Sequence, residues 1–281
     1  MGSIKRGWAL TGQSWRVLKS DLSPLMIFPL LSTVFAILAT AAIWAPTLIV
    51  RGVFDGQQVD SRDPIFYIAG LATAYLSTFI AIFFNVALAA CAVRSMRGED
   101  TKVSEGVIAA MHRLGPILGW TFVATTVGLI LRALEERLPL LGKIAVWLTG
   151  AAWAIATFFV VPVVALEGTG PIASLKRSAA VVKARWGESA TGAATITVVI
   201  WLVSIAIVVA GAGGAIGFLA IGQPVLAAVV VAITVAAIII VSLISSALGQ
   251  IFRVAVYQYA VSGQAPVGFD GQLLQAAFQR R

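Results

Sequence analysis

The chain has 281 residues, of which 59% are apolar and only 11% are charged, and its net charge is +8. A soluble domain is closer to half apolar and a quarter charged, so this composition excludes an ordinary soluble protein. No basic segment is long enough to line a nucleic-acid groove, so the excess of Lys and Arg is interpreted as one face of a membrane protein beside anionic lipid.

The first predicted element is an amphipathic helix over residues 3–22. Apolar residues fall close to one of its faces: Ile4, Trp8, Trp15, Leu18 and Leu22. The basic residues, which lie mostly elsewhere, are Lys5, Arg6, Arg16 and Lys19. Separate Trp/Leu and basic faces are typical of a helix at the lipid headgroup level, so these four cations are candidate contacts for inner-leaflet lipid.

Two apolar runs follow, over residues 25–50 and 65–93, and each is long enough to cross a bilayer. A polar loop over residues 51–63 connects them. Asn85 is the most polar residue of the second run. A polar turn, residues 94–100, then leads to a short amphipathic helix over 103–114.

The second hairpin consists of apolar runs 116–134 and 144–166, with a charged bend at Glu135, Glu136 and Arg137 between them. Both runs are expected to be single continuous helices, with Pro162 in the last turns of the second run. Residues 168–171 then break the helix.

The third surface helix is expected over residues 172–186. Its predicted apolar face is formed by Ile172, Leu175, Ala179 and Val182. Its cations, further candidate lipid contacts, are Lys176, Arg177, Lys183 and Arg185. The fifth and sixth spans are predicted over 190–210 and 225–254, with a Gly-rich turn at 211–222 and a final amphipathic piece over 269–278.

The predicted fold is therefore an all-α integral membrane protein with six transmembrane helices in three hairpins, each preceded by a cytoplasmic amphipathic helix. The domain is divided into units 1–93, 94–167 and 168–262, with a C-terminal tail over 263–281. The even-numbered spans end alike, because Gly98, Gly168 and Gly263 each lie a few residues before a new amphipathic segment. Independent solutions to the same bilayer constraint remain the alternative to a true repeat.

Charge predicts the orientation. Most of the Lys and Arg residues lie before span 1, between spans 2 and 3, between spans 4 and 5, and after span 6. Because translocation of Lys and Arg is disfavoured, this side is expected to be cytoplasmic, which places both termini in the cytoplasm and the protein in the cell membrane.

Asn85 and Gln250 form the candidate intramembrane polar site. Each lies the same number of residues before the turn glycine of its unit, Gly98 or Gly263. A polar group in hydrocarbon needs a partner or water, so the two residues either line a pore or tie helices together by hydrogen bonds.

No catalytic, cofactor-binding or metal-ligating set is predicted. Cys91 is the single cysteine and His112 the single histidine. The Gly211–Gly217 run lacks the strand–helix context of a dinucleotide site. Neither an acidic residue at a span centre nor a broken helix is expected, which disfavours an ion-coupled transporter.

Four stretches carry a resemblance: SIKRGW, FFNVALAACAVRSMRGED, LGPILGWTFVATTVGLILRALEERLPLLGKIAVW and ATFFVVPVVALEGTGPIASLKRSA. They resemble a family of prokaryotic multi-pass membrane proteins of unknown function. The layout is also similar, more distantly, to the membrane domain of some glycerophosphodiester phosphodiesterases. The resemblance implies a membrane class and no functional residues.

The expected function is that of a non-enzymatic membrane scaffold or lipid-interacting protein. The alternative is a homo-oligomeric channel or transporter for a small solute, using Asn85, Gln250, Ser242, Ser245 and Ser246. A membrane enzyme is the second alternative.

Overall fold

The computed structural model describes residues 12–19, 22–53, 63–185 and 189–271, which are helical apart from short turns and contain no strand. Six of the described helical segments are long and apolar enough to cross a membrane, which confirms the predicted all-α multi-pass fold. They are Leu25–Val50, Pro64–Ser95, Leu114–Arg137, Gly142–Glu167, Ile200–Ala220 and Pro224–Ser262.

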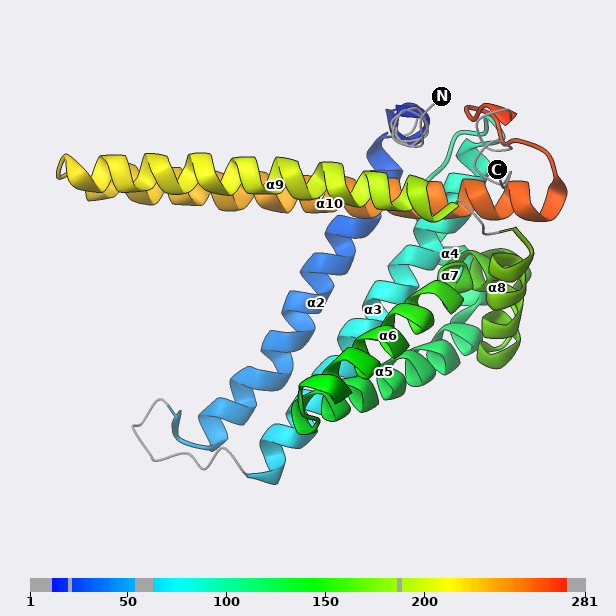
Figure 1. Ribbon diagram of the computed structural model, residues 1–281. Coiled ribbons are helices and arrows are strands. Elements are labelled where there is room, and N and C mark those ends of the chain that lie inside the picture. Colours follow the sequence, from blue (N-terminus) through cyan, green and yellow to red (C-terminus); the bar gives the residue numbers. More distant parts are fainter. Residues whose placement is uncertain (1–11, 20–21, 54–62, 186–188, 272–281) are drawn as a thin grey trace.

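A short helix precedes each of the three pairs of spans along the chain (Figure 1). A helix over residues 12–19 precedes α2 (Leu22–Val50) and α3 (Pro64–Ser95). Next, α4 (Val103–His112) precedes α5 (Leu114–Arg137), α6 (Leu140–Ala156) and α7 (Val160–Glu167). Last, α8 (Pro171–Arg185) precedes α9 (Ser189–Ala220) and α10 (Pro224–Ser262). The common origin of the three units remains a prediction.

The three exit glycines adopt the same backbone conformation. Gly98, Gly168 and Gly263 have φ of 78°, 64° and 72°, in the left-handed region that a side chain disfavours. A left-handed residue directly after a helix allows its last carbonyls to be capped as the chain turns away. At Gly168 an added Cβ would also collide with the Arg113 guanidinium, 2.0 Å away.

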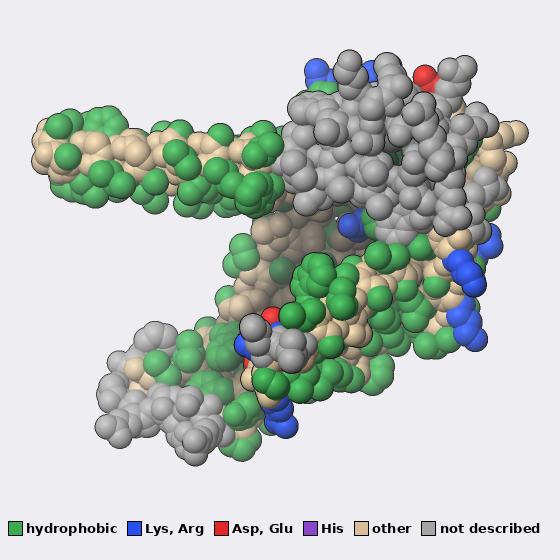
Figure 2. Space-filling model, viewed as in Figure 1, with side chains coloured by type: hydrophobic (Ala, Val, Ile, Leu, Met, Phe, Trp, Pro, Cys, Tyr) green, Lys and Arg blue, Asp and Glu red, His purple; other side chains and the backbone are tan. Residues whose placement is uncertain are grey.

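The core lies at one end of the molecule. It contains Leu25 and Phe28 of α2, and extends over the second half of α3, α7 and the second half of α10. Away from this end the helices expose large apolar side chains, visible in green over α9 and α10 and the lower part of the molecule in Figure 2. Lipid is the expected solvent for these surfaces, because acyl chains are as apolar as the side chains themselves.

The α9–α10 hairpin extends away from the other helices (Figure 1). The predicted Gly-rich turn at 211–222 is wrong, because α9 continues to Ala220 and the turn occupies only residues 221–223. Two of the glycines, Gly211 and Gly214, serve helix packing instead. An added Cβ at Gly211 would lie 2.1 Å from Thr234 Oγ1, and one at Gly214 would lie 3.3 Å from Val230. Small residues allow the two backbones to approach closely.

The predicted continuous fourth span is also corrected, because it is interrupted at residues 157–159, between α6 and α7. Pro162 explains the position: it lacks the N–H that would bond to the Phe158 carbonyl, and its ring would collide with that carbonyl in a regular helix. The hydroxyl of Ser178 in α8 fills the gap. It donates to the Ala156 carbonyl at 2.6 Å and accepts from the Phe159 amide at 3.0 Å.

Polar contacts join the connections at both ends of the bundle. Arg51 and Asp63 form an ion pair at 2.8 Å where α2 and α3 turn. At the core end, Arg94 pairs with Glu99 and Glu105. There the Asp270 amide also donates to the buried Gln13 side chain at 3.3 Å, so the first and last described segments lie together.

We predict that Ser178→Ala lowers the free energy of unfolding by about 2–4 kcal/mol, because it leaves a buried amide and a buried carbonyl without partners. Unfolding in mixed micelles of mild detergent and dodecyl sulfate measures this. The matched control is Ser204→Ala, whose hydroxyl bonds only to the Ile200 carbonyl of its own helix. Equal losses in the two variants would contradict the bridging role of Ser178.

Candidate functional site

Helix α8 presents cations outward from a buried polar side. Ser174 and Ser178 are fully buried and Val181 is nearly so, whereas Lys176 and Lys183 are exposed. This differs from the predicted apolar face: Leu175, Ala179 and Val182 are only half-buried, and Ile172 is 54% exposed. The buried side of α8 carries the hydroxyls of Ser174 and Ser178 because backbone groups of neighbouring segments form hydrogen bonds with them there.

Ser174 anchors the first turn of α8. Its hydroxyl lies 2.8 Å from Thr169 Oγ1 and donates to the Thr169 carbonyl at 3.0 Å. Together with the Ser178 bridge, this attaches α8 at two points, one before the helix and one in the interrupted fourth span. The orientation of its basic side is therefore set by buried hydrogen bonds.

Glu167, Arg177 and Tyr257 connect α7, α8 and α10. Arg177 Nε lies 3.1 Å from Glu167 Oε1, and the Tyr257 hydroxyl donates to the same carboxylate oxygen. Hydrogen bonds with Tyr257, first, and with Glu167 raise the pKa of the Arg177 guanidinium, which stays charged. This network neutralises the carboxylate that ends α7.

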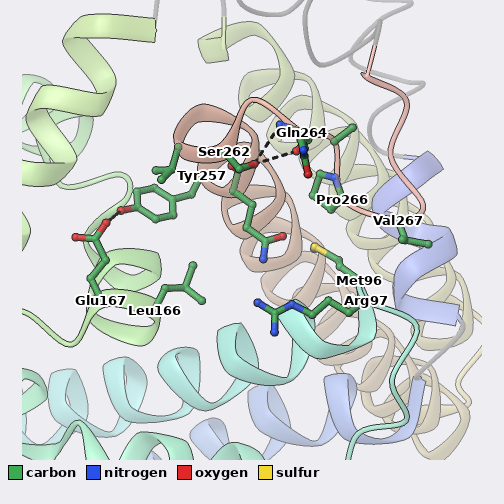
Figure 3. A pocket seen from close by; sticks show the side chains of 12 residues that line it. Met96, Arg97, Leu166, Glu167, Tyr257, Ser262, Gln264, Pro266 and Val267 are labelled. Carbon is green, nitrogen blue, oxygen red and sulfur yellow. Dashed lines mark hydrogen bonds between the residues drawn. The ribbon is translucent and has the colours of Figure 1, made fainter.

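A pocket of about 690 Å³ lies beside this network, where α3, α7 and α10 end (Figure 3). Glu167 and Tyr257 form one part of its wall, and Arg97 lies on the side opposite Ser262 and Gln264. Arg97 is exposed and has no ion pair among the described residues. The pocket therefore combines a free cation with an apolar lining, which includes Leu166, Val261, Pro266 and Val267.

The other predicted lipid contacts are only partly described. Arg16 and Lys19 are exposed on the first helix, and the Lys19 ammonium lies 5.8 Å from the centre of the Trp15 ring. Lys5 and Arg6 lie outside the described residues. The backbone of Arg185 is described as the end of α8, but its side chain is not.

Asn85 lines a small cavity of about 190 Å³ between α2, α3 and α10. Its amide nitrogen donates to the Ala81 carbonyl of its own helix at 2.8 Å, so this bond ties no helices together. The α10 side chains that share the cavity are Ser242, Leu243 and Ser246 rather than Gln250. The equivalent depth of Asn85 and Gln250 stays a prediction.

Gln250 is buried in the core at 2% exposure. Neither atom of its amide group has a hydrogen-bond partner in the described structure. Ser246 and Gln250 are four residues apart, so they lie on the same side of α10. The pore-lining and helix-tying interpretations of Gln250 both remain predictions.

Three features were missed from the sequence: the role of Ser178, the break before α7 and the place of Arg97 in the pocket. Pro162 was a usable signal for the break, because a proline inside a helix frees the carbonyl four residues before it. Ser178 carried no comparable signal, since its partners come from another helix. Among the residues described, no group of three or more His, Cys, Asp or Glu could hold a metal ion.

Comparison with known proteins shows a match to a protein family. The family of unknown function DUF6159 matches residues 65–268, which is most of the chain and agrees with the resemblance to an uncharacterised family. No curated protein and no solved structure matches. The likeness to phosphodiesterase membrane domains has no support in these comparisons.

We predict that Gln250→Met raises the free energy of unfolding by about 1–2 kcal/mol, because a buried amide without partners is replaced by an apolar side chain of similar size. The measurement is again unfolding in mixed micelles. Gln223→Met, at an exposed position before α10, is the control and should have no effect. A loss of stability in Gln250→Met would reveal a polar partner.

Proposed function

We propose that this chain, which belongs to the DUF6159 family of unknown function, is a non-enzymatic membrane protein that binds anionic lipid headgroups. The binding face would be the end of the bundle where α3, α7 and α10 terminate. It includes the basic side of α8 and the neighbouring pocket with Arg97.

The observation that carries this proposal is the unequal pairing of charges at that end. Three carboxylates at this end, those of Glu99, Glu105 and Glu167, are paired with arginine, whereas exposed Asp100 forms no ion pair with a described residue. Several exposed cations also have no ion pair within the described part of the chain, and they include Arg16, Lys19, Arg97, Lys102, Lys176 and Lys183. Unpaired cations near an anionic leaflet contribute about 1 kcal/mol each.

The rigid attachment of α8 supports the same proposal. Because Ser174 and Ser178 hold the helix by partly buried hydrogen bonds, the face of α8 that carries its lysines is oriented without lipid. A preorganised site loses less conformational freedom on binding. The basic side of α8 is visible in blue at the right of Figure 2.

The orientation follows from the same charges. We place this end on the cytoplasmic side of a prokaryotic cell membrane, with both termini cytoplasmic, because loops rich in Lys and Arg are retained there. Anionic lipid also gives the cytoplasmic leaflet its negative surface potential.

A channel or transporter for a small solute is the second candidate. The interrupted fourth span favours it, since discontinuous helices recur in transporters near their binding sites. However, Ser178 satisfies two backbone groups at the interruption, the Ala156 carbonyl and the Phe159 amide, which leaves less polar backbone for a solute.

We predict that phosphatidylglycerol raises the Tm of the purified protein more than phosphatidylcholine does. The Lys176→Gln/Lys183→Gln variant should lose about 1 kcal/mol of lipid-binding free energy for each charge removed. Lys143→Gln, exposed on α6 beside the opposite bend, should bind as the parent does. Equal responses to the two lipids, or an equal loss in the control, would contradict the proposed headgroup site.

We also predict that alkaline phosphatase, which is active only outside the cytoplasm, is active when fused after Arg137. The same enzyme fused after Arg97 should be inactive, and a fluorescent protein fused after Arg281 should fluoresce. The reverse pattern would invert the orientation and place the basic end outside.

A further inference from the structure

The cavity at Asn85 contains polar groups that the protein itself does not use. Most threonines of the spans donate their hydroxyl to the carbonyl four residues earlier, as Thr33 and Thr40 do. Ser32, Ser242 and Ser246 line the cavity and make no hydrogen bond to another described residue; Ser242 and Ser246 are exposed at its open side. The amide oxygen of Asn85 likewise has no recorded partner, so the cavity offers donors and acceptors to a ligand.

The cavity contains no charge. Its remaining wall is apolar and includes Phe28, Phe84 and Leu88, with no Lys, Arg, Asp or Glu among the lining residues. Ser32 and Asn85 each lie about 15 Å along their helices from the core end, by the helical rise of ~1.5 Å per residue. At that depth a charged group is costly, whereas a neutral hydroxyl can be satisfied by side-chain hydrogen bonds.

A lateral groove adjoins the cavity. This groove, of about 610 Å³, follows α2 from Ser32 to Trp44 and shares Ser32, Thr33 and Ala81 with the cavity wall. Three of its polar side chains are already satisfied. Thr33 and Thr40 bond to their own helix, and the Trp44 indole donates to Thr73 Oγ1 at 3.0 Å. The groove therefore presents a largely apolar track that starts at a polar, uncharged cavity.

The same side of α10 carries further unused polar capacity. Gln250 lies one turn after Ser246, is almost fully buried, and has neither amide atom bonded. A buried amide without partners is rare in a folded protein and calls for an explanation.

We propose that the cavity and groove bind one neutral lipid with a free hydroxyl, such as a diacylglycerol. Its hydroxyl end lies among Asn85, Ser242 and Ser246, and an acyl chain follows the groove beside α2. The cavity excludes phospholipid headgroups because it holds no cation for a phosphate. This site is separate from the basic side of α8 and does not rest on headgroup binding there.

The test is photocrosslinking of the purified full-length protein in detergent. The probe is a diacylglycerol with a diazirine in one acyl chain, and phosphatidylglycerol and phosphatidylcholine with the same chain serve as comparison probes. The expected result is labelling of α2 and α3 peptides that line the groove by the diacylglycerol probe, with competition by unlabelled diacylglycerol.

Two variants examine the polar end. Asn85→Leu removes the amide and Ser246→Leu fills the cavity, and each should reduce groove labelling about fivefold, as expected for the loss of one hydrogen bond to the ligand. Should one variant fail to fold, the other provides the measurement. Ser204→Leu on α9, remote from the cavity, is the control and should label as the parent does.

Equal groove labelling by the phospholipid probes would overturn the proposal, as would unchanged labelling in a folded Asn85→Leu or Ser246→Leu variant. Failure here is distinguishable from failure of the headgroup proposal. Lys176→Gln/Lys183→Gln should lose the response to phosphatidylglycerol and retain labelling by the diacylglycerol probe.

Discussion

A backbone amide or carbonyl that is removed from water inside a bilayer must find its partner within the protein. At the interruption of the fourth span, one hydroxyl, that of Ser178, serves two such groups, the Ala156 carbonyl and the Phe159 amide. The hydroxyl of Ser178 thereby joins α8 to the fourth span by specific hydrogen bonds. That junction helps to set the direction of the basic side of α8. It also helps to set the position of Glu167, which lines the pocket where α3, α7 and α10 end.

The core end and the distal helices differ in the kinds of side chain that they bury and expose. The core end collects the buried side chains, the ion pairs and the unpaired cations, whereas the distal helices and the α9–α10 hairpin expose Leu, Ile and Val. Hydrophobic burial therefore holds the core end together. Other contacts hold the lipid-facing helix pairs together. Helices α9 and α10 approach closely at Gly211 and Gly214, and the Trp44 indole of α2 donates to a hydroxyl of α3. Burial of apolar side chains does not drive these helices together, because lipid is equally apolar.

Periodic and compositional features were predictable from the sequence. The six spans, the short helices before each pair and the left-handed glycines at 98, 168 and 263 follow from run length, amphipathicity and local backbone preference. Features that depend on a partner distant in the sequence were not. Gly211 to Gly217 suggested a turn because the apposed Thr234 was unknown. The match in depth between Asn85 and Gln250 stays a prediction, because helix register cannot be derived from equal spacing to a glycine.

The length of α10 has a mechanical consequence. Its 39 residues form one unbroken helix, about 58 Å long at a rise of ~1.5 Å per residue, roughly twice the thickness of a bilayer hydrocarbon layer. Its first part belongs to the hairpin with α9, and its second part carries Gln250 and Tyr257 within the core. A thicker or thinner bilayer changes the tilt that such a hairpin adopts. Because α10 runs without a break from the hairpin into the core, a change in hairpin tilt would reach the segment that carries Tyr257, the partner of Glu167.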